Sequence, residues 1–143
     1  MAATVQCDIV SAEKQIFSGK VEMVVATGVS GELGILPGHS ALLTAIEPGP
    51  VRLIMEGGEE ETFFASGGFL EVQPNAITIL ADTAVRADDL DEAAVLISQE
   101  KAAKELSDSA DRIDFAKAQA ELIESAAMIR TIQKTREKRG GRR

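Results

Sequence analysis

Side chains that commonly carry out catalysis or bind metals are sparse in this sequence. His39 is the only histidine and Cys7 the only cysteine, so neither a zinc site nor a serine–histidine–aspartate triad can be assembled from them. Consecutive carboxylates occur at residues 59–61, but an acidic run beside glycines is typical of a solvated hairpin turn. We therefore expect no catalytic residue, no metal site and no cofactor. A small hydrolase that uses His39 is the enzymatic alternative.

Phosphate and nucleic-acid sites are equally hard to find. The sequence has no GxxxxGK(S/T) loop, and its Gly-rich stretches at 28–34 and 66–68 lead into expected strands rather than into a helix N-terminus. Tryptophan and tyrosine are absent, which removes the usual stacking platforms for bases. A net charge of −8 would repel a phosphate backbone, so we expect no nucleic-acid partner.

The elements that position these residues change in character near Ala84. Ten of the 12 glycines and all 4 prolines precede this point, and residues 75–139 contain neither. Residues 1–84 carry 3 basic and 11 acidic side chains, whereas residues 85–143 carry 12 of each. Glycine and proline punctuate strands, and their absence favours helix, so we predict a β-rich unit at 1–86 and a helical unit at 87–143.

Apolar and polar residues alternate in several short stretches of the first unit. Val5, Cys7 and Ile9 form one such stretch, and residues 21–25 and 51–55 form others, as half-buried strands do. Turn residues at 56–59 and at Pro74-Asn75 predict two hairpins. Many short strands separated by such turns indicate an antiparallel β-sandwich with Cys7 in its core.

The apolar period becomes helical after the acidic cluster at residues 88–92. Asp89 is expected to cap a first helix, with Glu92 three residues later completing a capping box. This helix should run to about Leu106, and Asp111 should cap a second one. Two helices joined by so short a turn form an antiparallel hairpin. The predicted fold class is therefore α+β, with an N-terminal antiparallel β-sandwich followed by a C-terminal antiparallel two-helix hairpin.

The second expected helix has a wide apolar face and a basic end. Its two neighbouring seams contain Phe115, Ala118, Leu122, Ile129 and Ile132 on one side and Ile113, Ala116, Ala120, Ile123 and Ala127 on the other. One seam can dock on the sandwich, or the face can serve another protein, and the sequence leaves both open. Seven positive residues from Arg130 onward against one Glu indicate an acidic protein groove or nucleic acid as partner, and the negative charge of the sandwich favours the acidic protein.

Several segments carry a family resemblance. They read GELGILPGH at 31–39, SGGFLEVQP at 66–74, LADTA at 80–84 and DLDEA at 89–93. In this order and at this spacing they resemble the epsilon subunit of the bacterial F-type ATP synthase. The resemblance covers nearly the whole chain and implies the same two-part fold.

The resemblance also implies a function and partners. Such a subunit is a non-catalytic part of the rotor, binds the gamma subunit and rests on the ring of membrane c subunits. It would lie at the cytoplasmic face of the bacterial inner membrane, held there only through the complex. Gly31, Glu32 and Leu33 match the loop that faces the ring, and His39 matches the segment close to gamma.

The helical hairpin of this family can lie folded on the sandwich or extend along gamma into the catalytic head of alpha and beta subunits, where it blocks ATP hydrolysis. The resemblance therefore implies a regulatory role for four cations near the end of the chain, namely Arg130, Lys134, Arg136 and Lys138. A free-standing adaptor or chaperone that grips clients with the hairpin is the alternative, and co-purification would separate the two.

Some members of the family bind ATP at the start of the hairpin. Leu90 and Asp91 match the beginning of that motif, but its arginine position holds Ala94. The corresponding positions of the second helix hold Glu124 and Met128, which cannot pair with phosphate. We expect no tight ATP site, and the cations that could compensate are Arg86 and Lys101.

Overall fold

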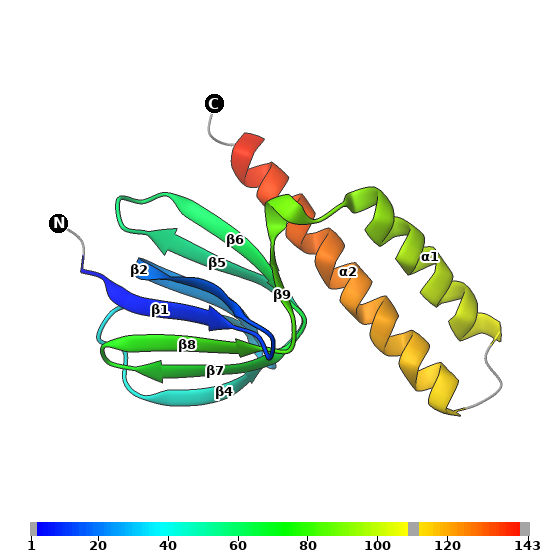
Figure 1. Ribbon diagram of the computed structural model, residues 1–143, viewed down its shortest axis with the longest axis horizontal. Coiled ribbons are helices and arrows are strands. Elements are labelled where there is room, and N and C mark those ends of the chain that lie inside the picture. Colours follow the sequence, from blue (N-terminus) through cyan, green and yellow to red (C-terminus); the bar gives the residue numbers. More distant parts are fainter. Residues whose placement is uncertain (1–2, 109–111, 141–143) are drawn as a thin grey trace.

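The computed structural model describes the backbone of residues 3–108 and 112–140. Strands make up the first part of the chain and two helices the second, as predicted (Figure 1). The strands are β1 (Val5–Val10), β2 (Gln15–Gly28), β3 (Gly31–Ile35), β4 (Leu42–Ile46), β5 (Gly49–Met55), β6 (Glu60–Ala65), β7 (Gly68–Gln73), β8 (Ala76–Ala81) and β9 (Ala84–Arg86). A 3₁₀ turn, η1 (Ala87–Asp89), leads into the helices α1 (Glu92–Asp108) and α2 (Arg112–Gly140).

The strands form one sheet that folds over on itself. Their order is β1-β8-β7-β4-β2-β5-β6-β9, β3 pairs with β2, and β1 closes the path by also pairing with β2. In Figure 1, β5 and β6 lie on one side and β4, β7 and β8 on the other. The 14-residue β2 joins both sides because it pairs with β1, β3 and β5. Pairings are antiparallel apart from that of β1 with β8, and both predicted hairpins are present.

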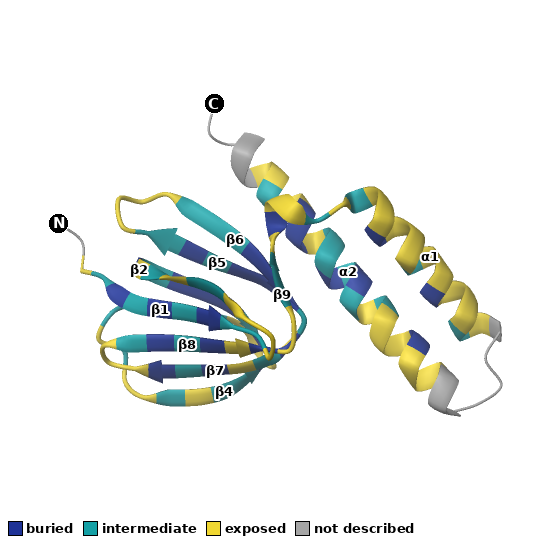
Figure 2. Ribbon diagram, in the orientation of Figure 1, coloured by how far each residue is buried: buried dark blue, intermediate teal, exposed yellow. Residues whose placement is uncertain are grey.

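The core lies between the two sides of this folded sheet. Its buried cluster runs from Val5 to Ala81 in sequence, so the apolar core belongs to the strands alone. The ring of Phe63 is fully buried and meets that of Phe17 edge to face, with centroids 5.7 Å apart. Cys7 lies within this cluster, as its place in the alternation of β1 predicts. Buried residues follow the strands in Figure 2, whereas most helical residues are exposed.

Because the whole core cluster lies before residue 86, we expect a fragment of residues 1–86 to fold alone. The fragment keeps β9, which pairs with β6 and closes that edge of the sheet. Thermal unfolding followed by circular dichroism should show a β-type spectrum and a cooperative transition. An aggregating fragment without such a transition would argue against two separable units.

Burial also controls the chemistry of the lone cysteine. Removal from water, helped by the nearby Asp8 carboxylate, raises the pKa of the Cys7 thiol from its ordinary 9.0 to about 12. The unfolded chain releases this proton above pH 9, while the folded chain keeps it, so the free energy of unfolding falls as the pH rises from 9 towards 12.

We therefore expect Cys7 to resist thiol reagents in the native protein and to add to alkaline destabilisation. Denaturant unfolding at pH 8 and above pH 10 measures the second effect. The matched control is Cys7→Ala, which lacks the thiol and should lose less stability over the same pH interval. Equal losses in the two proteins would contradict the assigned pKa.

The first helix begins at a different cap from the predicted one. Oδ1 of Asp91 accepts hydrogen bonds from the backbone N–H groups of Ala93 at 3.1 Å and Ala94 at 3.4 Å. The prediction that Asp89 caps this helix together with Glu92 is wrong, because Asp89 ends the preceding η1 turn. Several acidic residues follow one another here, so residue type alone could not identify the cap. The η1 turn excludes Asp89 from that position.

The two helices form the predicted antiparallel hairpin, and α2 is the helix that meets the sandwich. It contacts β5, β6 and η1, while α1 packs on α2 (Figure 1). The first helix ends at Asp108, slightly beyond the expected Leu106, and the predicted cap Asp111 lies outside the described residues. In this conformation the apolar face of α2 therefore docks on the sandwich, which is one of the two interpretations that the sequence left open.

The apolar seams of α2 are only partly covered in this docked state. Ala118 and Ile132 of one seam and Ala127 of the other are buried. Phe115 and Ile123, by contrast, are exposed. The side chain of Ile113 lies outside the described part of the structure. The hairpin therefore keeps apolar surface in water while it is docked.

Candidate functional site

The residues that match the ring-facing loop lie at the turn between β2 and β3. Gly31 has a φ of +125°, a conformation that other residues rarely adopt, so the sharp turn depends on this glycine. Glu32 follows it, pairs in register with Thr27 and is exposed, whereas Leu33 is half-buried against the core. Glu32 is therefore accessible to another protein, whereas Leu33 packs the turn against the core.

His39 lies apart from this turn, beyond the other end of β3. Its Nδ1 is 2.7 Å from the carbonyl oxygen of Ser40, and the N–H of the adjacent Gly38 donates to the carbonyl of Pro74 at 3.1 Å. His39 is therefore next to the β7–β8 turn, not next to Glu32. The four predicted partner residues therefore lie at two separate places on the sandwich.

An exposed apolar patch lies on the outer face of β4, β7 and β8. Leu43, Phe69 and Leu80 are 69%, 54% and 47% exposed, although they are large apolar side chains in regular strands. Phe69 and Leu80 are direct cross-strand neighbours, and Ala45 of β4 lies opposite Phe69. The sequence analysis missed this patch. The signal was available, since these residues are apolar at positions that alternate with buried ones.

The predicted regulatory cations of α2 differ in their surroundings. Nζ of Lys134 donates to Oε1 of Glu32 at 2.7 Å, which ties α2 to β3. Arg136 pairs with Glu92 at the start of α1. Arg130 is exposed and makes no ion pair with the described side chains. The side chains of Lys138 and of the arginines after it lie outside the described residues.

The pairing with Lys134 changes the acidity of Glu32. The hydrogen bond and the charge of Lys134, with a further contribution from Arg52, lower the pKa of the Glu32 carboxyl below its ordinary value. The ion pair is therefore complete at neutral pH. Its contribution to stability is present above the ordinary pKa of 4.5 and is lost as the pH falls through the lowered pKa.

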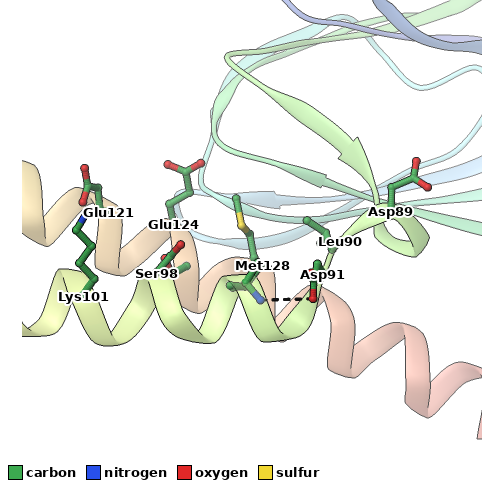
Figure 3. A pocket seen from close by; sticks show the side chains of 11 residues that line it. Asp89, Leu90, Asp91, Ser98, Lys101, Glu121, Glu124 and Met128 are labelled. Atoms are coloured by element: carbon green, nitrogen blue, oxygen red, sulfur yellow. Dashed lines mark hydrogen bonds between the residues drawn. The ribbon is translucent and has the colours of Figure 1, made fainter.

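A cavity of about 450 Å³ lies between the start of α1 and the middle of α2 (Figure 3). It brings together the positions that the family resemblance associates with ATP binding. The lining residues are Asp89, Leu90, Asp91, Ala94, Val95, Ser98, Lys101, Glu121, Glu124, Ser125 and Met128. Figure 3 shows Lys101 beside Glu121, and the carboxylates of Glu121, Glu124 and Asp89 on the same side of the helices.

The charges of this cavity are wrong for a nucleotide. Four of its side chains are carboxylates and only Lys101 is a cation, so the lining would repel a triphosphate. Arg86, the other cation considered from the sequence, does not line the cavity, because it pairs with Glu61 at 2.9 Å and lies over the ring of Phe63. The residues present therefore do not fit ATP.

Two comparisons of sequence decide the family. Residues 4–87 match the family model of the ATP synthase delta/epsilon chain β-sandwich domain. The chain is also 57% identical over 141 residues to the ATP synthase epsilon chain of Chromohalobacter salexigens, covering 99% of both chains. It belongs to the epsilon chain family of ATP synthases. The resemblance inferred from the sequence is thereby confirmed.

Two chains from solved structures of mitochondrial ATP synthases share the fold. The chain superimposes with a TM-score of 0.81 and 22% identity on a chain of the Euglena gracilis mitochondrial ATP synthase, covering 90% of this chain and 81% of that one. A chain from the central stalk and c-ring of the Tetrahymena thermophila mitochondrial ATP synthase gives a TM-score of 0.63 and 14% identity, with coverage of 92% and 98%. At these identities the likeness concerns the fold.

Membership of the epsilon chain family confirms that the chain is a non-catalytic subunit. Within the described residues, no group of three or more metal-ligating side chains could hold a metal ion. None of the described helices is long and apolar enough to cross a membrane.

We expect no tight binding of ATP to this epsilon chain, because the cavity between the helices is lined by four carboxylates and one lysine. Calorimetric titration of the full chain with ATP and magnesium should show no saturable heat in the micromolar range. A double replacement, Glu121→Arg with Glu124→Arg, tests the reason, since it should introduce measurable affinity. Micromolar binding by the natural sequence that Lys101→Ala abolishes would contradict the expectation.

Proposed function

We propose that this chain is a rotor subunit that couples the membrane c-ring and the gamma subunit to ATP synthesis, with a helical hairpin that inhibits ATP hydrolysis. Family membership carries the assignment to ATP synthase. The division of the chain into a sandwich and a helical hairpin that keeps exposed apolar side chains supports the finer roles.

The apolar patch of β4, β7 and β8 is the proposed contact with gamma. Phe69, Leu80 and Leu43 expose large apolar side chains on one continuous strand face, and surfaces of this kind mark protein interfaces. His39 lies at the loop that leads into β4, at the same end of the patch as the shallow hollow lined by Leu43 and Glu71. The His39 loop and the apolar strand face beside it are together typical of a large and stable protein interface.

The β2–β3 turn is the proposed contact with the c-ring. Gly31 permits the tight turn and Glu32 projects from it with half of its side-chain surface exposed. The turn is separated from His39 by the length of β3, so both partners can be bound at once. The subunit would then lie at the cytoplasmic face of the bacterial inner membrane, attached only through the complex.

We propose that the hairpin is the part of the chain that inhibits ATP hydrolysis. Its docked form leaves Phe115 and Ile123 in water, and its C-terminal end carries the exposed Arg130. An extended form that inserts between alpha and beta subunits would cover the apolar side chains and bring the cations to acidic loops. Two such states can exchange if they differ by only a few kcal/mol.

Co-purification with gamma tests the assignment. The full chain should bind purified gamma, and Phe69→Glu should weaken binding strongly, because it places a charge in the centre of the proposed interface. The control is Ile97→Glu on α1, a still more exposed apolar residue outside the patch, which should bind normally. Unchanged binding by Phe69→Glu would contradict the patch, and capture of many unrelated chains instead of gamma would favour the adaptor alternative.

A further inference from the structure

Phe64 of β6 is buried on the side of the sheet that faces away from the core. It is 1% exposed, yet it does not belong to the core cluster, whereas its neighbour Phe63 does. Successive residues of a strand point to opposite faces, so Phe64 lies on the outer face of β6. Val25 of β2 is buried outside the core cluster in the same way. A part of the molecule other than the core therefore keeps water from these two side chains.

The docked hairpin supplies this cover. α2 contacts β5 and β6, and η1 contacts β6 as well. Lys134 of α2 reaches Glu32 of β3, which identifies the side of the helix that faces the sandwich. Thr131 and Ala127 precede Lys134 by three and seven residues, so they lie on that same side, and neither has any exposed surface. Both are short, and Phe64 is the large apolar side chain that the strands contribute to the contact.

Charged groups lie beside Phe64 on this outer face. Glu60 precedes Phe64 by four residues in the same strand, and Nη1 of Arg52 donates to its Oε1 at 3.1 Å. The Glu60 side chain is 4% exposed, and both Glu60 and Asp88 of η1 take part in further interactions. Burial of a charged pair costs much of what the pairing gains. These groups therefore favour one position of the helix more than they add to the strength of docking.

We propose that Phe64 is the anchor of the docked hairpin, and that its burial determines how often the hairpin is released. Removal of an aromatic ring from water stabilises a contact more than an exposed ion pair such as Lys134–Glu32 does. Undocking uncovers Phe64 and Val25, and this apolar exposure opposes release. Anchoring is a property of the chain by itself. Its effect on ATP hydrolysis rests on the proposed inhibition by the extended hairpin.

This role predicts a change in hydrolysis opposite in sign to that caused by removing the hairpin. A weaker anchor favours the extended state, which is the proposed inhibitory state. A complex that carries Phe64→Ala should therefore hydrolyse ATP more slowly than the natural complex. Loss of subunit structure would instead remove the inhibition and speed hydrolysis, as truncation is expected to do.

Distance measurements on the full chain test the anchor directly. Nitroxide labels at Glu59→Cys on the β5–β6 turn and Ile97→Cys on α1 report docking, and the buried Cys7 stays unlabelled. Phe64→Ala should raise the ratio of undocked to docked chains about tenfold or more, as loss of a central interface anchor does. The conservative Phe64→Leu should restore most of the docking. Lys134→Gln should raise the ratio by only about fivefold or less, the range of an exposed pair.

The matched control is Phe63→Leu, the same change at the adjacent residue, which points into the core. It should lower the melting temperature and leave docking unchanged, whereas Phe64→Leu should loosen docking with a smaller change of the melting temperature. An undocked fraction that Phe64→Ala does not raise would overturn the anchor, whatever happens to hydrolysis. Undocking by Phe64→Ala without slower hydrolysis would leave the anchor standing and refute the proposed inhibition by the extended hairpin.

Discussion

Removing residues 88–143 is expected to raise ATP hydrolysis by the assembled complex severalfold, while assembly and ATP synthesis are largely kept. The sandwich retains its whole core and both proposed partner surfaces in such a truncation. What is lost is the hairpin, which keeps exposed apolar side chains while docked, as expected if a docked and an extended state exchange. Hydrolysis and synthesis by complexes containing the full and the truncated chain measure the effect directly.

The cations of α2 separate inhibition from docking. Arg130 makes no ion pair with the described side chains in the docked state, so Arg130→Ala should raise hydrolysis without loosening the hairpin. Lys134→Ala should act on both states, because it also removes the pair with Glu32. Raised salt should weaken inhibition, since exposed charge pairs are screened. Equal hydrolysis with full and truncated chains would mean that the hairpin is not a brake in this protein.

Reversing the charge of Glu32 is expected to reduce coupling much more than folding. The side chain is half exposed at a turn, so Glu32→Lys should change the free energy of unfolding by about 1 kcal/mol or less. At a close interface, however, a like-charge contact costs several kcal/mol. The new lysine would also face Lys134 and Arg52, so the hairpin should undock more often.

Proton pumping in reconstituted membranes, together with a thermal melt, separates the two effects of Glu32→Lys. The control is Glu56→Lys, another charge reversal of an exposed carboxylate, at the far turn between β5 and β6. The control should pump protons normally. Normal pumping by Glu32→Lys as well would show that this turn does not carry the ring contact.

The strand part of the fold could be predicted because local and tertiary preferences agree there. In β1, Val5, Cys7 and Ile9 alternate with half-buried residues and all three face the core. The β5–β6 and β7–β8 hairpins follow from their Gly- and Pro-containing turns. The parallel pairing of β1 with β8 could not be predicted, since it joins strands distant in sequence that no turn connects.

The candidate sites were only partly readable from the sequence. The family motif singled out Glu32 and His39, but nothing local to either residue reveals that β3 separates them. The pairing of Lys134 with Glu32 spans 102 residues and depends on how α2 docks, so no local pattern encodes it. The cap of α1 was misplaced because Asp89 and Asp91 are equally good caps by residue type.

Locking the hairpin in its docked position tests most directly whether it must leave the sandwich to inhibit. A complex that carries Glu32→Cys and Lys134→Cys can be bridged with a cleavable bis-maleimide, because the two side chains are in contact and Cys7 is buried. The two single-cysteine variants treated with the same reagent are the controls. The locked complex should hydrolyse ATP as fast as the truncated one and slow down again after the bridge is cleaved. A locked complex that stays as inhibited as the cleaved one would contradict a brake that works by release of the hairpin.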